Sequence, residues 1–240
     1  MTVRTPPEDE GCADPWRVAV AVLAKEPIPG LVKTRLCPPY SLQDAARLAA
    51  AALADTMDAV AGARTVSKRV LVLDGDATAW RRPGFDTLPQ RGDGLDERLD
   101  NALTDVASMT GLPVLLVGMD TPQLDPALLD RAATALRRAD AVLGLATDGG
   151  FWAIGVRAPQ RGHCVGVPMS RSDTGHHQLR QLRGHGLSTT LLEPLTDVDD
   201  AATAGIVAAA APDTRFARLV AELAGAPEHD RRAGMIAAQA

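Results

Sequence analysis

Cations cluster in one short stretch of this sequence, directly after an apolar run. The stretch AKEPIPGLVKTRLCPP, residues 24–39, holds Lys25, Lys33 and Arg35 among prolines and Gly30. Lysine and arginine on a stiffened, glycine-containing loop are charge-assisted donors for phosphate oxygens. By composition alone, a surface loop whose basic residues are simply solvated is an equally good interpretation.

Carboxylates follow three later apolar runs. Asp120 comes after LLVGM, Asp148 stands in TDGGF, and Asp197 and Asp199 alternate in TDVDD. Carboxylate oxygens are ligands that Mg²⁺ and Mn²⁺ favour, and a nucleotide's phosphates usually need such a cation. We therefore expect Asp120 and Asp199 to hold Mg²⁺ or Mn²⁺. The structural alternative for each is a turn or helix-capping residue.

Two other polar groups are interpreted as structural. The pair Asp74 and Asp76 in DGD resembles a metal-binding motif but equally describes a tight turn, which we favour. The histidines of HHQ, residues 176–178, lie near His163 and Cys164, yet their spacing fits no closed metal site. We expect those histidines to be exposed to solvent.

Length and composition indicate one globular domain. The chain has 240 residues, 46% of them hydrophobic, and a formal net charge of −5, which argues against a broad nucleic-acid-binding face. Its three scattered cysteines, the polar N-terminus and the lack of a membrane-length apolar run favour the cytoplasm and no membrane partner. We expect a domain over residues 16–224 between flexible tails at 1–15 and 225–240.

Short apolar runs alternate with amphipathic stretches, a pattern typical of βαβ units and a mostly parallel sheet. We predict strands at 18–24, 69–74, 113–120, 141–147, 151–156 and 188–195, and helices at 41–63, 94–109, 125–139, 200–211 and 214–225. Ligands of such sheets bind at the carboxyl ends of the strands. The cationic loop and the three carboxylate segments should therefore meet at one edge.

Several segments together carry a family resemblance. AKEPIPGLVKTRL, QRGDGLDERLDNAL, VGMDTPQLDPALL, GLATDGGFWAIGV and DVDD, in this order, resemble the DUF2064 family, whose members are often labelled glycosyltransferases of the nucleotide-diphospho-sugar transferase (GT-A-like) superfamily. VKTRL is also similar to a segment of the F420-pathway guanylyltransferases, and the order of motifs is similar to that of the molybdenum-cofactor nucleotidyltransferases. The resemblance implies a Rossmann-like GT-A fold with helices on both faces of the sheet, a nucleotide on the first loop and a metal at Asp120.

Residue roles follow from the loop, the carboxylates and this resemblance. We assign nucleotide binding to Lys25, Gly30, Lys33, Thr34, Arg35 and Gln90, catalysis to Lys33 and Asp148, and acceptor binding to Gly149, Gly150 and Ser170. Where the family commonly has Trp-Ser-Thr, this chain reads VPMSRSDTG at 167–175, so Ser170 keeps a serine but the aromatic residue is lost.

Two reactions fit these residues. In the one we favour, a small phosphorylated or carboxylated acceptor attacks the α-phosphorus of a nucleoside triphosphate held by the cationic loop. In the alternative, a sugar moves from a nucleoside diphosphate sugar to a small acceptor, with Asp148 or Asp199 as base. A non-catalytic nucleotide-binding protein is a third possibility, but it gives no reason for the carboxylates.

Overall fold

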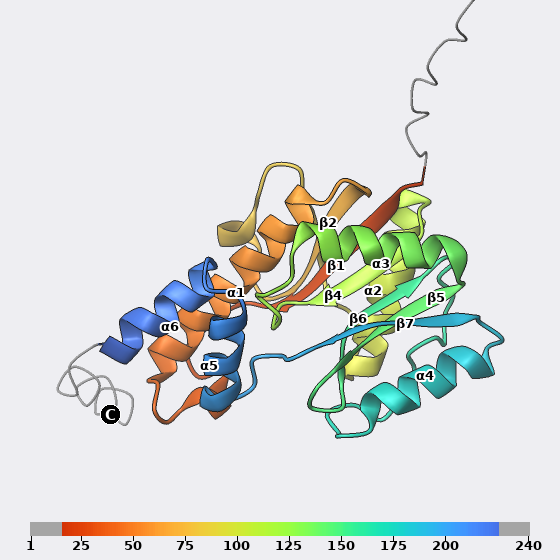
Figure 1. Cartoon of the computed structure of the whole chain (residues 1–240). Helices are drawn as coiled ribbons and strands as arrows, with labels where there is room; N and C mark the ends of the chain where they lie inside the picture. Colours follow the sequence, from red (N-terminus) through yellow and green to blue (C-terminus); the bar gives the residue numbers. More distant parts are fainter. Residues whose placement is uncertain (1–15, 226–240) are drawn as a thin grey trace, which may run out of the picture.

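The computed structural model describes residues 16–225, which form a seven-stranded sheet in the order β3-β2-β1-β4-β6-β5-β7 (Figure 1). The strands are β1 (Val18–Lys25), β2 (Val66–Asp74), β3 (Asp86–Pro89), β4 (Val114–Gly118), β5 (Ala141–Ala146), β6 (Phe151–Val156) and β7 (Thr189–Leu195). The helices are α1 (Leu42–Gly62), α2 (Leu95–Thr110), α3 (Pro126–Arg138), α4 (Thr174–Gly184), α5 (Ala201–Ala210) and α6 (Arg215–Gly225), with 3₁₀ turns η1 (Thr34–Leu36) and η2 (Thr78–Trp80).

The Rossmann-like GT-A fold expected from the sequence is confirmed. Apart from Gly225, which ends α6, the expected tails lie outside the described residues. None of the helices within residues 16–225 is long and apolar enough to span a membrane.

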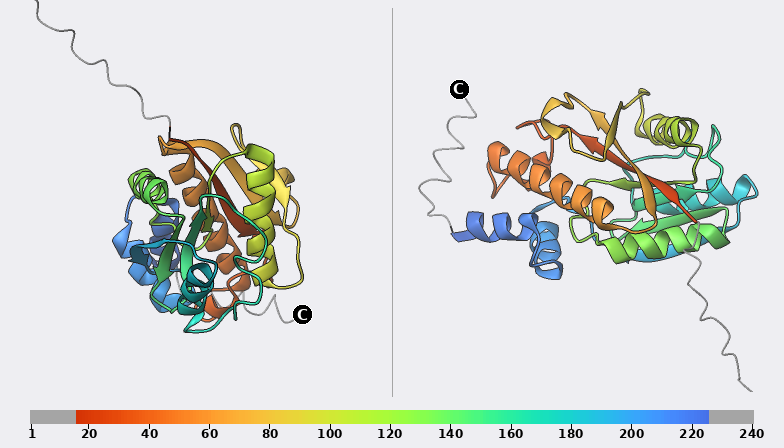
Figure 2. Two further views of the ribbon diagram at one scale, coloured as in Figure 1. Left: turned by 90° about the vertical axis from the view of Figure 1, so that its right-hand side faces the viewer. Right: turned by 90° about the horizontal axis from the view of Figure 1, so that it is seen from above.

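Helices cover both faces of the sheet, and the alternation of side chains along β1 shows how. Val18, Val20 and Val22 pack in a core with α1 and α3, whereas Ala19 and Ala21 face a second core with α2 and α4. The left view of Figure 2 shows the sheet between α3 and α2. A strand buried on both faces must be apolar throughout, which explains the continuous run at this position.

Strand β6 alone runs against the others. It pairs antiparallel with both β4 and β5, whereas the other neighbouring strands of the sheet pair in parallel. Only residues 147–150 separate β5 from β6, and so short a connection can form a hairpin but no crossover. The hairpin turn therefore lies at the carboxyl end of β5, on the same edge as the ends of β1 and β4.

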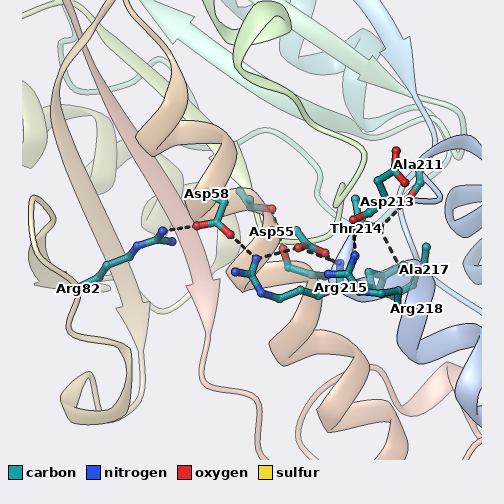
Figure 3. A network of polar contacts seen from close by, with 12 residues as sticks. Asp55, Asp58, Arg82, Ala211, Asp213, Thr214, Arg215, Ala217 and Arg218 are labelled. Atoms are coloured by element: carbon teal, nitrogen blue, oxygen red, sulfur yellow. Dashed lines mark hydrogen bonds and ion pairs between the residues drawn. The ribbon is translucent and has the colours of Figure 1, made fainter.

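A third hydrophobic cluster joins α5 and α6 to α1. It buries Leu36 of the first loop and Val198 of the segment before α5 together with Phe216 of α6. Asp55 of α1 fixes the start of α6, because its carboxylate accepts hydrogen bonds from the backbone N–H groups of Arg215, at 3.1 Å, and Phe216, at 2.8 Å (Figure 3). The α5–α6 pair thereby holds two functional segments against one helix.

Three details differ from the sequence predictions. The short edge strand β3 and helix α4 were not predicted, since β3 has four residues and α4 carries two histidines and two arginines among few apolar side chains. Strand β4 ends at Gly118, so Asp120 follows the strand instead of ending it. The predicted helices 41–63 and 200–211 begin with the caps Ser41 and Asp200, because each side chain accepts a hydrogen bond from the backbone N–H three residues later.

The contact between Asp55 and α6 generates a stability prediction. Asp55 is buried and pairs with the Arg215 guanidinium at 3.1 Å, so Asp55→Ala leaves the backbone N–H groups of Arg215 and Phe216 without their acceptor and removes one of two carboxylate partners of the guanidinium, which keeps Asp58. We expect a loss of about 2–3 kcal/mol in the free energy of unfolding, measured in urea. Asp105→Ala, which removes an exposed pair with Arg91, should cost less than about 1 kcal/mol. Equal losses in the two variants would contradict this anchoring role.

Candidate functional site

The strand ends enclose a cavity of about 850 Å³ at the carboxyl edge of the sheet. Its walls come from the ends of β1, β2 and β4, the β5–β6 turn, the first turn of α2, the loop 169–172 and the segment after β7. A volume of this size is typical of small-molecule sites. The predicted meeting of the cationic loop with the carboxylate segments is confirmed, because Lys25, Arg35, Asp120, Asp148 and Asp199 all line this space.

Asp197 also lines this cavity, and its pKa is raised. Burial is the largest cause, followed by the negative charge of Asp148; the charge of Asp120 raises the pKa further, and that of Lys33 lowers it. The Asp197 carboxylate is therefore close enough to Asp148 and Asp120 to be repelled by both. The sequence analysis considered Asp197 but chose Asp199, since both stand on the same extended segment.

Lys33 contacts the Asp120 carboxylate but does not line the larger cavity. Its Nζ lies 2.9 Å from Oδ1 of Asp120 and also donates a hydrogen bond to the Val198 carbonyl. Oδ1 of Asp120 is buried, although the whole side chain is 41% exposed, and among the residues that the structure describes the Lys33 ammonium is the cation paired with it. Lys33 was assigned to phosphate binding and catalysis, and both remain predictions. In this structure its charge is engaged inside the protein.

Arg35 is held differently. Its Nη1 donates to Oδ2 of Asp199 at 2.7 Å, and this hydrogen bond raises the pKa of Arg35. The Arg35 side chain is 74% exposed and that of Asp199 is 41% exposed, so water and ligands reach both. Metal binding by Asp199 remains a prediction.

A smaller hollow of about 300 Å³ adjoins the larger cavity. Lys33 and Thr34 line it, while Lys25, Arg35 and Asp120 form the wall common to both spaces. Gly30 lines neither space; its φ of 79° fits the sharp turn at the start of the loop.

Gln90 and Gly149 of the β5–β6 turn also have structural roles. The Gln90 amide donates to the carbonyls of Ala24, at 2.7 Å, and Val72, at 3.2 Å, so it ties β1 to β2 beside the cavity. Gly149 does not line the cavity, and a Cβ there would lie 1.9 Å from the Ser172 carbonyl oxygen. Gly149 thus lets loop 169–173 pack on the turn.

The other two residues assigned to the acceptor, Gly150 and Ser170, do line the cavity. Asp148 is fixed beside them, because its Oδ1 accepts a hydrogen bond from the Gly150 N–H at 2.7 Å. Ser170 has a φ of 57°, a left-handed conformation uncommon for a residue with a side chain. Acceptor binding by all three predicted residues stays a prediction.

Two residues that line the cavity, Arg98 and Asp74, were not predicted to belong to the site. Asp76 behaves as a turn residue, accepting from the Thr78 N–H and hydroxyl, as predicted. Asp74, however, lines the cavity and accepts from Arg98 Nη1 at 2.6 Å, while Arg98 Nε donates to the Gly92 carbonyl. The signal was available: Arg98 stands one turn into a helix that begins at the predicted ligand edge.

The histidines divide by position. His176 is exposed, as expected, and His177 pairs with Asp173 at 3.2 Å. His163 is buried instead, with its ring edge-on to His185 at a centroid distance of 5.4 Å, and burial lowers its pKa.

The carboxylates have the right chemistry for Mg²⁺ or Mn²⁺, but in this structure Asp120 and Asp199 are each paired with a cation of the protein. Within residues 16–225, no three His, Cys, Asp or Glu side chains are grouped so that they could hold a metal ion. The buried oxygen of Asp120 contacts an ammonium group where a metal would need it. The Asp199 carboxylate is likewise paired with the Arg35 guanidinium.

Comparison with known proteins gives a family and a fold. Residues 44–171, more than half of the chain, match the model of a family described as "Uncharacterized protein conserved in bacteria" (DUF2064). The chain matches no curated protein by sequence.

Solved structures share the fold over most of their length. A candidate nucleotide-diphospho-sugar transferase from Desulfovibrio desulfuricans G20 is 25% identical, with a TM-score of 0.78 over 85% of this chain and 94% of that one. The CMP:2-keto-3-deoxy-manno-octonic acid synthetase in complex with CTP is 11% identical, with a TM-score of 0.52 over 78% and 94%. Rv0371c from Mycobacterium tuberculosis H37Rv is 21% identical, with a TM-score of 0.52 over 78% and 95%.

The raised pKa of Asp197 predicts a pH-dependent stability change. A carboxyl group whose pKa is raised by folding destabilises the folded protein above that pKa and has no effect below the unfolded pKa of about 3.9. In metal-free solution, Asp197→Asn should therefore raise the melting temperature at pH 7, and the gain should vanish as the pH falls towards about 4.

The neighbouring residue supplies the control. Asp199→Asn removes a more exposed carboxylate that already has Arg35 as a partner, so it should give no gain at pH 7. Melting curves of both variants and the wild type, recorded across this pH range with a chelator present, make the comparison. A gain from Asp197→Asn that does not depend on pH would refute the electrostatic explanation.

Proposed function

The chain belongs to the DUF2064 family, and we propose that it is a transferase that binds a nucleotide in the larger cavity. One observation carries the proposal: exposed cations and a group of carboxylates meet in a single cavity at the carboxyl edge of a GT-A-like sheet. Lys25 and Arg35 are the cations positioned to receive phosphate oxygens from solvent. The similarity to nucleotide-using transferases supports the same class of substrate.

We favour nucleotidyl transfer. An acceptor oxygen would form a bond to the α-phosphorus of a nucleoside triphosphate while the bond to the bridging oxygen breaks, and pyrophosphate would leave with the electron pair. Lys25 and Arg35 would offset the charge of the phosphates, and two such cations suit a triphosphate. Asp148, fixed by the Gly150 N–H, would orient the acceptor. Mg²⁺ or Mn²⁺ at Asp120 and Asp199 is part of the proposal, although both carboxylates face cations in this structure.

Glycosyl transfer is the second candidate, and the similarity to the D. desulfuricans protein favours it. Here an acceptor hydroxyl would attack the anomeric carbon, the bond from that carbon to the diphosphate would break, and a nucleoside diphosphate would leave. Asp148 would take the proton of the hydroxyl, a role its exposed carboxylate at the cavity wall permits.

A thermal-shift panel separates the two reactions by their donors. Nucleoside triphosphates and nucleoside diphosphate sugars, each with and without Mg²⁺ or Mn²⁺, should stabilise the protein by about 2.7 kcal/mol at 100 times their dissociation constant. A larger shift with triphosphates supports nucleotidyl transfer, and one with nucleotide sugars supports glycosyl transfer. No shift with any nucleotide would refute the proposed site.

The cationic wall makes a second prediction. Lys25→Ala and Arg35→Ala should each weaken nucleotide binding about tenfold, because each removes a charge-assisted contact to phosphate. Their residual binding should also depend less on salt. Arg91→Ala, which removes a surface cation paired with Asp105 on the outer side of α2, is the matched control and should bind as the wild type does. Isothermal titration at two salt concentrations measures both effects; unchanged affinity in Lys25→Ala and Arg35→Ala would contradict a phosphate role.

A further inference from the structure

We infer that Lys33 is an internal counter-ion of Asp120, and that its ammonium group and a divalent cation compete for this carboxylate. The inference rests on the proposed site, because it concerns how that site admits a metal. It differs from the role expected from the sequence, in which Lys33 contacts phosphate.

The contacts of Lys33 are those of a buried cation in a fixed place. Its side chain is 13% exposed, against 74% for Arg35 two residues later. The Nζ atom has two oxygen partners, the Val198 carbonyl and Oδ1 of Asp120 at 2.9 Å. To reach a phosphate in the larger cavity, which Lys33 does not line, the ammonium group would have to give up both partners.

The backbone keeps Lys33 in this position. Its φ of 50° and ψ of 34° are left-handed values, which a residue with a side chain adopts mainly when its surroundings impose them. The Lys33 carbonyl accepts from the Leu36 N–H at 3.0 Å, and Leu36 is fully buried against α1 and α6. Leu36 thus anchors the loop in the cluster with α1 and α6, while the Lys33 side chain extends to Asp120.

The opposite partner is equally fixed. The Val198 N–H donates to the Asp120 carbonyl at 2.9 Å, so the segment after β7 and the loop after β4 are joined where the ammonium group meets both. The Asp197 carboxylate also lies close enough to feel the charge of Lys33, and among the described residues the ammonium group is the cation paired with Oδ1 of Asp120. A divalent cation is attracted to the same oxygen, and two cations cannot share it without strong repulsion.

Chemical labelling tests the position of Lys33 in the unaltered protein. The lysines of the sequence are Lys25, Lys33 and Lys68, and the other two are exposed, so each molecule carries its own controls. Without metal, acetic anhydride should acetylate Lys33 at least about tenfold more slowly than Lys25 and Lys68, as measured by mass spectrometry of peptides. Saturating Mn²⁺ should accelerate labelling of Lys33 and leave that of Lys68 unchanged.

Variants test the competition with a readout of metal alone. Lys33→Met keeps the length of the side chain but removes its charge, so Mn²⁺ measured by electron paramagnetic resonance should bind about tenfold more tightly than to the wild type. Arg35→Met removes a cation from the same loop whose side chain is 74% exposed and therefore screened by water, so it should change the affinity less. Lys33→Met combined with Asp120→Asn should lose the gain.

The outcomes separate this inference from the proposed function. Unchanged or weaker Mn²⁺ binding by Lys33→Met, or Lys33 labelling as fast as Lys68, overturns the counter-ion role. Should Lys33→Met fail to fold, Lys33→Asn is the substitute, because asparagine tolerates left-handed backbone, and the labelling result decides independently. Nucleotide binding by the wild type is read in the same samples. If it persists when the Lys33 results fail, only the counter-ion role is refuted, whereas its absence refutes the proposed function.

Discussion

Repulsion of the Asp197 carboxylate by those of Asp148 and Asp120 is the constraint on which the rest of the site depends. Asp120 and Asp148 follow the buried strands β4 and β5, whose ends are set by the packing of the cores, whereas Asp197 follows the edge strand β7, whose residues are exposed or half-buried. Partial burial makes this repulsion costly, as the raised pKa of Asp197 shows. A cation beside these carboxylates offsets the repulsion, and in this structure Lys33 provides it.

The α5–α6 pair explains how the Lys33 ammonium group is held in position. Leu36, at the end of the cationic loop, and Val198, between two of the aspartates, are buried in the same cluster with Phe216. This small core therefore holds the loop after β1 and the segment after β7 in a fixed position relative to each other. These helices are therefore part of the site's support, although none of their side chains lines the larger cavity.

The sequence was sufficient for features that depend on local chemistry or regular packing. Apolar runs located the strands that carry the site, and the rule for the carboxyl edge of parallel sheets brought Arg35 and Asp148 to one cavity. The sequence did not show which way individual side chains point or which of them pair with one another. Periodicity cannot tell that Asp74 pairs with Arg98, or that Lys33 turns inward while Arg35 remains exposed, because contacts between distant segments decide both. The direction of β6, by contrast, follows from the short connection between the two predicted strands.

The antiparallel strand β6 also determines how the cavity is divided. Its hairpin with β5 places Asp148 and Gly150 on one wall, and loop 169–172 packs there because Gly149 leaves room for the Ser172 carbonyl. The cations of the first loop form the other wall. If phosphates bind to the cations, an acceptor is left with the wall that carries Asp148, so donor and acceptor approach from opposite sides. Direct displacement needs this geometry whether the atom attacked is phosphorus or an anomeric carbon, so the number of phosphates that the cationic wall accommodates is what distinguishes the two reactions.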